Sequence, residues 1–100
     1  MVITMAEYHT TTCEILMPIE DDIVIHVAPA SGDGYPADFT KAFIVKKNTV
    51  VKLNTAVWHL APLPLNKEKA TTLIVLPERT YANDCTVVDL TPEQQFIIEA

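Results

Sequence analysis

The sequence predicts an all-β protein, built as a small barrel or sandwich of short antiparallel strands. Short runs rich in valine, isoleucine, leucine and threonine recur at intervals of roughly ten residues. Turn-forming residues separate these runs, and no convincing helical pattern lies between them. These features together are typical of small all-β folds rather than of sheets whose strands alternate with helices.

Six strands are expected in chain order, at residues 13–19, 23–27, 41–45, 49–53, 71–76 and 85–90. An acidic turn separates the first two strands, and residues 31–36, SGDGYP, hold both glycines of the chain and form its clearest loop. The turn Lys46-Lys47-Asn48 is expected to close a hairpin, because asparagine tolerates the left-handed conformation.

A short helix is expected only at the carboxyl end. Thr91-Pro92-Glu93-Gln94 has the pattern of a capping box with proline at the first helical position. The residues that follow would complete about two turns.

Composition limits the class of protein. The 100 residues suit a single domain, 1–100, and the 49% hydrophobic content is typical of a folded globular chain. A net charge of −6 with scattered lysines and arginines argues against nucleic-acid binding.

No apolar run approaches the roughly 20 residues that cross a bilayer, and Glu7 and His9 interrupt the start before a signal peptide develops. We therefore expect a cytoplasmic protein without nucleic-acid or membrane partners, in which Cys13 and Cys85 are reduced and buried.

A group of polar residues near the start of the chain has the spacing of a binding site. Glu7 and His9 are two residues apart and share one face of an extended segment. Glu14 shares its strand face with Leu16, and a carboxylate on an apolar face needs a partner.

A second candidate lies in TAVWHLAPLPL, residues 55–65, where two prolines exclude a helix. If this segment ends a strand, His59 points inward and Trp58 points the opposite way into a packed layer. His26, in contrast, is expected to be an ordinary strand residue.

The spacing Glu7-x-His9-x4-Glu14 resembles the first metal motif of the cupin superfamily, H-x-H-x3-4-E, with a carboxylate replacing the first histidine. His59 falls on the histidine of the second motif, although the glycine, proline and asparagine of that motif are absent. The resemblance implies a small cupin-like barrel with these four side chains at its mouth. Two imidazoles and two carboxylates suit a divalent ion such as Mn, Fe or Ni, and less naturally four-coordinate Zn.

A longer resemblance, to the ureidoglycolate lyase family, covers most of the chain. That family carries an E-x-H segment followed by a glutamine, an R-A-F strand, a V-W-H segment and a late cysteine. In this chain, Glu7 and His9 match the E-x-H segment and Glu14 takes the place of the glutamine. The R-A-F strand corresponds to Lys41-Ala42-Phe43, the V-W-H segment to Val57-Trp58-His59, and the cysteine to Cys85.

The chain departs from the family pattern at Lys41, Asn54 and Leu60, where the family has arginine, histidine and histidine. A lysine keeps the charge of arginine but loses the forked geometry that clamps a carboxylate. The departures leave two functions open.

The first function, implied by the family, is cleavage of ureidoglycolate to glyoxylate and urea. Glu14 and His59 would then be catalytic, Lys41 and Trp58 would contact the small carboxylate substrate, and Glu7, His9, Glu14 and His59 would hold a Ni, Mn, Fe or Zn ion. The alternative is a divergent cupin that binds or acts on another small polar ligand, such as a sugar or sugar acid, with or without catalysis. A homodimer is expected in either case, because a small barrel leaves a strand edge and an apolar face to cover.

Overall fold

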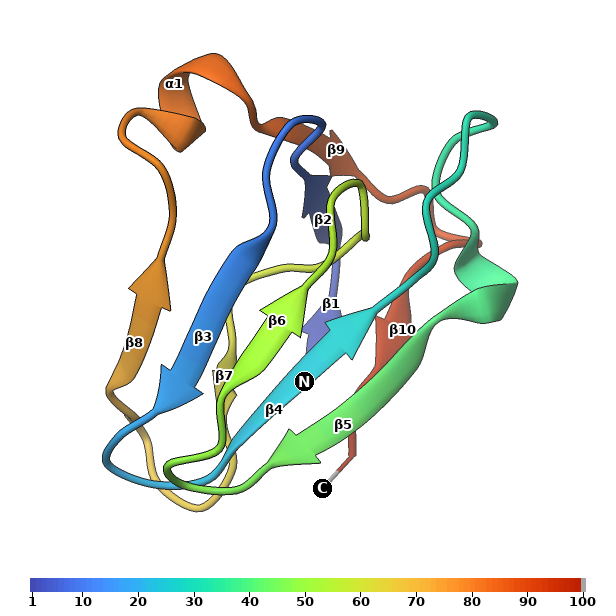
Figure 1. The fold of residues 1–100 in the computed structure, drawn as a ribbon. Coiled ribbons are helices and arrows are strands. Elements are labelled where there is room, and N and C mark those ends of the chain that lie inside the picture. The colour runs from blue at the N-terminus through green and yellow to red at the C-terminus, as the bar shows by residue number, and fades with distance from the viewer. Residues whose placement is uncertain (100) are drawn as a thin grey trace.

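The computed structural model describes residues 1–99 and is nearly all β (Figure 1). This confirms the all-β prediction. The strands are β1 (Val2–Ile3), β2 (Met5–Tyr8), β3 (Glu14–Pro18), β4 (Ile23–Val27), β5 (Lys41–Val45), β6 (Val51–Leu53), β7 (Leu63–Pro64), β8 (Thr72–Val75), β9 (Thr86–Asp89) and β10 (Phe96–Ile97). A 3-10 turn, η1 (Ala37–Phe39), and a single helical turn, α1 (Thr80–Asn83), complete the elements of this part of the chain.

Within residues 1–99 the strands form four small antiparallel sheets. β3 lies between β6 and β8, β4 lies between β5 and β7, β2 pairs with β9, and β1 pairs with β10. In Figure 1 the β6–β3–β8 sheet and the β4–β5 pair face the viewer, and β1, β2, β9 and β10 lie behind them. Two isolated bridges, Glu7–His59 and Ala28–Trp58, tie the segment after β6 to both groups.

Most strands between residues 23 and 89 lie close to the positions that the sequence predicts. β4 and β5 have the predicted bounds, and β6, β8 and β9 are shortened at their ends. Asn48 adopts the left-handed conformation with φ of 67°, as expected for the turn. The expected hairpin is wrong, however, because β5 pairs with β4 while β6 pairs with β3 in a different sheet.

The predicted carboxyl-terminal helix is also wrong. The Gln94 side chain accepts a hydrogen bond from the Thr91 N–H at 3.0 Å, as in a capping box, but only one turn forms. The chain then extends into β10, where Phe96 lies opposite Ile3 and packs against the core. A helix this short does not offset its own nucleation cost, whereas the strand gains pairing and burial.

Buried apolar residues gather in two clusters in the described part of the chain. One surrounds Trp58, whose ring meets Tyr8 and Tyr35 edge-on at centroid distances of 4.6 and 5.4 Å. The other lies between β3, β4, β5 and β6 and consists of Leu16, Ile23, Ile25, Val45 and Leu53. Among residues 1–99, no helix is long and apolar enough to cross a membrane.

Candidate metal centre

Four of the side chains singled out in the sequence meet in space. Nε2 of His9 lies 3.3 Å from Oε1 of Glu14, and Nε2 of His59 lies 3.5 Å from the same oxygen. The His9 Nε2 atom is also 4.0 Å from Oε2 of Glu7. Residues from the amino-terminal end of the chain and from its middle therefore form one compact group.

Backbone pairing brings these side chains together. Glu7 and His59 exchange main-chain hydrogen bonds of 2.8 and 2.9 Å, and partners in such a bridge project to the same face. Glu14 opens β3 opposite Leu53 and shares its face with buried Leu16. Because Trp58 precedes His59 along an extended segment, its side chain points away from the group into the other core cluster.

The group is almost closed to solvent. His9, Glu14 and His59 are 2%, 4% and 3% exposed. Burying imidazoles and carboxylates without partners is costly, so a buried cluster of this kind requires compensation from hydrogen bonds or from a bound cation.

The tautomers of both histidines follow from their hydrogen bonds. Nδ1 of His9 lies 2.7 Å from the main-chain oxygen of Asp84, and Nδ1 of His59 lies 3.0 Å from that of Val57. Since a carbonyl oxygen only accepts, each Nδ1 carries the hydrogen and donates it. Each Nε2 then presents a lone pair to the centre of the group, the orientation typical of metal-ligating histidines.

With these tautomers, both Nε2 atoms and the carboxylate oxygen that they face can only accept hydrogen bonds. The Nε2 lone pairs point toward a carboxylate oxygen of Glu14, and Nε2 of His59 is buried without a hydrogen-bond partner in the described part of the chain. The centre therefore requires positive charge, supplied by a proton on an imidazole or by a metal ion.

The pKa values reflect this mutual dependence. Burial acts to raise the pKa of Glu14, but its interactions with the adjacent His59 and His9 imidazoles together hold that pKa below its ordinary value. Burial acts to lower the pKa of His59, but the Glu14 carboxylate 3.5 Å away and the hydrogen bond to the Val57 carbonyl raise it above the ordinary value. Each group thus stabilises the charged form of the other.

A divalent metal ion fits these residues. Glu7, His9 and His59 each offer a ligand atom, and the three atoms lie within 4.8 Å of one another. Imidazole nitrogen and carboxylate oxygen are common ligands of divalent first-row metals. The unpaired Nε2 of His59 and the two Nδ1–H groups fixed on carbonyls are features expected of metal-ligating histidines.

Three residues around the group were missed as site residues by sequence reasoning. The Cys85 thiol donates to Oε2 of Glu7 at 2.8 Å, and the Asp84 carbonyl accepts from His9. Burial, then the hydrogen bond and charge of Glu7, raise the pKa of Cys85 to about 12, so it remains a thiol. The exposed ring of Tyr81, on α1, lies edge-on to His9 at 6.3 Å. The sequence signal for this segment was the family's late cysteine, which carries no role by itself.

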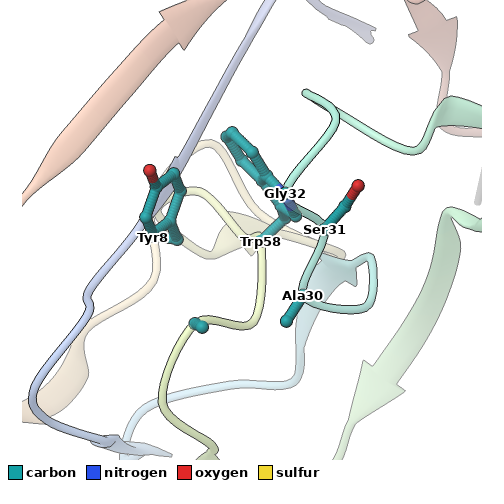
Figure 2. A pocket seen from close by; sticks show the side chains of 6 residues that line it. Tyr8, Ala30, Ser31, Gly32 and Trp58 are labelled. Atoms are coloured by element: carbon teal, nitrogen blue, oxygen red, sulfur yellow. The ribbon is translucent and has the colours of Figure 1, made fainter.

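Lys41 and Trp58 lie outside the group of four. Trp58 lines a cavity of about 340 Å³ together with Tyr8 and residues 30–32, and Figure 2 shows the two aromatic rings beside that loop. Lys41 opens β5 and lines another cavity, of about 350 Å³, whose other walls are apolar, including Phe39 and Phe43. Their roles as substrate contacts remain predictions.

His26 is a buried strand residue, 1% exposed, whose ring meets Phe96 edge-on at 5.1 Å. Neither of its ring nitrogens has a hydrogen-bond partner among residues 1–99. Burial, and secondarily the charge of His59, lower its pKa to about 4, so the ring is neutral near pH 7.

Comparison with known proteins adds one finding. The model of a protein family described as ureidoglycolate lyase matches residues 1–99. No curated protein matches the chain. The match includes every residue of the buried group and the 81–85 segment beside it.

Proposed function

The chain belongs to the ureidoglycolate lyase family, and we propose that it is a metal-assisted lyase that splits ureidoglycolate into glyoxylate and urea. The observation that supports this most is the buried group in which two Nε2 lone pairs and the Glu7 and Glu14 carboxylates face one point. The donor set favours Mn, Fe or Ni over Zn, because both carboxylates and imidazoles are present and the group is not a closed tetrahedron of sulfur and nitrogen.

Glu7, His9 and His59 would hold the ion. When bound, a divalent ion supplies Lewis-acid stabilisation of negative charge that develops on a substrate oxygen. The main-chain hydrogen bonds to Nδ1 of both histidines fix their rings, so that binding requires little reorganisation.

Glu14 is the group we assign to proton movement. Cleavage of ureidoglycolate removes the hydroxyl proton, breaks the carbon–nitrogen bond and returns a proton to the leaving urea nitrogen. The lowered pKa of Glu14 keeps it a carboxylate that can accept the hydroxyl proton and then donate it to that nitrogen. The neighbouring His59 imidazole, whose Nε2 lies 3.5 Å from Oε1 of Glu14, favours the carboxylate form of Glu14.

Lys41 is proposed to bind the carboxylate of the substrate. Its position in the family pattern supports this, as does the lack of any acidic partner within 4.0 Å among residues 1–99. A point charge at the rim of an apolar cavity would attract a small anion to a protein of net charge −6.

We also propose that the protein is cytoplasmic and acts as a homodimer. β5 is an edge strand whose Phe43 and Ile44 are 49% and 55% exposed on opposite faces. Such an edge is expected to be covered in solution.

The deciding experiment combines metal analysis with an assay of urea release. Protein loaded separately with Mn²⁺, Ni²⁺, Fe²⁺ or Zn²⁺ is expected to release urea and glyoxylate in equal amounts from ureidoglycolate, and a Glu14→Gln variant is expected to bind metal but release little urea. If protein with demonstrated metal occupancy releases no urea above the metal-free control, the proposed reaction is wrong.

A further inference from the structure

We propose that Asp84 and Cys85 are positioning residues of the metal centre, which hold His9 and Glu7 in the orientation that a metal requires. The role toward the metal rests on the proposed function, whereas the orientation itself can be measured in metal-free protein. Two consecutive residues contact two different ligands, one through the main chain and one through the side chain.

Asp84 holds His9 from two sides. Its main-chain oxygen accepts the Nδ1–H of His9 at 2.7 Å. The Asp84 side chain binds the two residues that directly follow His9 in the chain. Its Oδ1 accepts hydrogen bonds from the N–H and the hydroxyl of Thr10, both at 2.7 Å. Its Oδ2 accepts from the N–H and the hydroxyl of Thr11, at 2.8 and 2.6 Å. Four short hydrogen bonds to one carboxylate fix the backbone after His9 relative to the carbonyl that holds its ring.

The Asp84 main chain is itself fixed. Its N–H donates to the carbonyl of Thr80 at 2.8 Å and closes α1, and the buried Thr80 hydroxyl donates to Pro77 at 2.8 Å. On the other side, β9 begins at Thr86, which lies opposite Tyr8 of β2. The Asp84-Cys85 pair is therefore anchored at both ends beside the strand that carries Glu7.

Cys85 orients the other ligand. Its S–H donates to Oε2 of Glu7 at 2.8 Å, the same oxygen that lies 4.0 Å from Nε2 of His9. A donor at this position limits rotation of the carboxylate and keeps one oxygen near the histidine. In this arrangement Cys85 is a hydrogen-bond donor to a ligand, not itself a ligand.

Loss of such outer contacts typically lowers metal affinity about 10- to 100-fold. Asp84→Ala keeps the main-chain oxygen but removes the four side-chain bonds that fix it relative to His9, and Cys85→Ala removes the donor to Glu7. We expect a decrease in this range for both, measured for Mn²⁺ and Ni²⁺ by competition with a chromogenic chelator. Cys85→Ser, which keeps a donor, is expected to retain most of the affinity, and Asp84→Asn to be intermediate. The matched controls Asp89→Asn, at an exposed position of β9, and Cys13→Ser are expected to bind as the unmodified protein does.

A second readout needs no metal. Long-range ¹H–¹⁵N spectra of metal-free protein are expected to show His9 as the Nδ1–H tautomer, and Asp84→Ala is expected to give a mixture of tautomers while Cys85→Ala does not. Circular dichroism establishes that each variant is folded. If Asp84→Ala does not fold, Thr10→Val, which removes one of the four bonds, carries the same test with a smaller expected shift.

The proposal is overturned for Asp84 if a folded variant keeps both the His9 tautomer and the metal affinity of the unmodified protein. It is overturned for Cys85 if Co²⁺ produces a thiolate charge-transfer band that Cys85→Ser removes, because Cys85 would then be a ligand. If affinities and tautomers change as expected but no urea is released, the positioning role stands and the proposed reaction alone fails.

Discussion

Glu7 and His59 are joined by a pair of main-chain hydrogen bonds, so a carboxylate and an imidazole from distant parts of the sequence face the same point. The neighbouring bridge between Ala28 and Trp58 fixes the same segment from its other edge. The candidate ligands are thus held by strand pairing rather than by mobile loops, which favours a preorganised centre.

His59→Ala is expected to abolish retention of a divalent ion, because it removes one of the three clustered ligand atoms. It also removes one of the two imidazoles beside the buried Glu14 carboxylate and leaves His9 as its remaining partner, so we expect an unfolding free energy lower by about 1–3 kcal/mol. Elemental analysis after gel filtration and urea denaturation measure the two effects. Metal content equal to that of the unmodified protein would exclude His59 as a ligand.

Trp58→Ala is expected to lower the unfolding free energy by about 3–5 kcal/mol, because it empties the space between Tyr8 and Tyr35 in the core. Denaturation followed by circular dichroism measures this. Tyr81→Ala, which truncates an exposed ring, serves as the control and is expected to change stability little. Equal effects of the two substitutions would contradict the placement of Trp58.

His26 is expected to make the fold sensitive to acid. Its pKa is about 4 in the folded protein against an ordinary value of 6.5, so the unfolded chain takes up the proton first as the pH falls. The stabilisation is complete above pH 6.5 and is lost between 6.5 and about 4, at up to about 1.4 kcal/mol per pH unit. His26→Leu is expected to flatten this part of the stability profile, and identical slopes would show that His26 does not contribute.

Lys41→Ala is expected to weaken binding of a small carboxylate while leaving the fold intact, because the side chain is exposed and opens β5. Calorimetry with glyoxylate should give an affinity lower by several-fold. Lys52→Ala, an exposed lysine on β6, is the matched control. An affinity unchanged by the Lys41 substitution would assign this residue to the solvated surface.

The proposed homodimer predicts a mass about twice the 11.1 kDa of the chain in light scattering. Ile44→Lys, which places a charge on the exposed edge strand, is expected to shift the mass toward the monomer. A monomer at every concentration tested would contradict the proposal.

The sequence predicts the centre of the fold well. Residues 23–27 and 41–45 consist mainly of β-branched or apolar residues and are bounded by turn residues, and their strands have the predicted bounds. The alternation of Glu14 with its neighbours placed that carboxylate on the buried face. Strand bounds and the face on which a side chain lies are determined by neighbouring residues, so a local sequence pattern predicts them.

Other features depend on partners distant in the sequence. The capping pattern at Thr91 is present, but pairing of Phe96 with β1 decides the structure of the residues that follow. The contacts of Asp84 with Thr10 and Thr11 cross more than seventy positions of the chain, and no local pattern reveals them.

The hydrogen bonds of the 84–85 pair have a consequence for the order in which the protein matures. They join positions separated by 75 and 78 residues, so the contacts that orient His9 and Glu7 cannot form until most of the chain has left the ribosome. Contacts of such long range slow folding, because the loop between them must close before they contribute. The proposed metal binding is therefore expected to occur late in biogenesis, and a ribosome-bound nascent chain stalled before residue 84 should capture an ion far less well than the released protein.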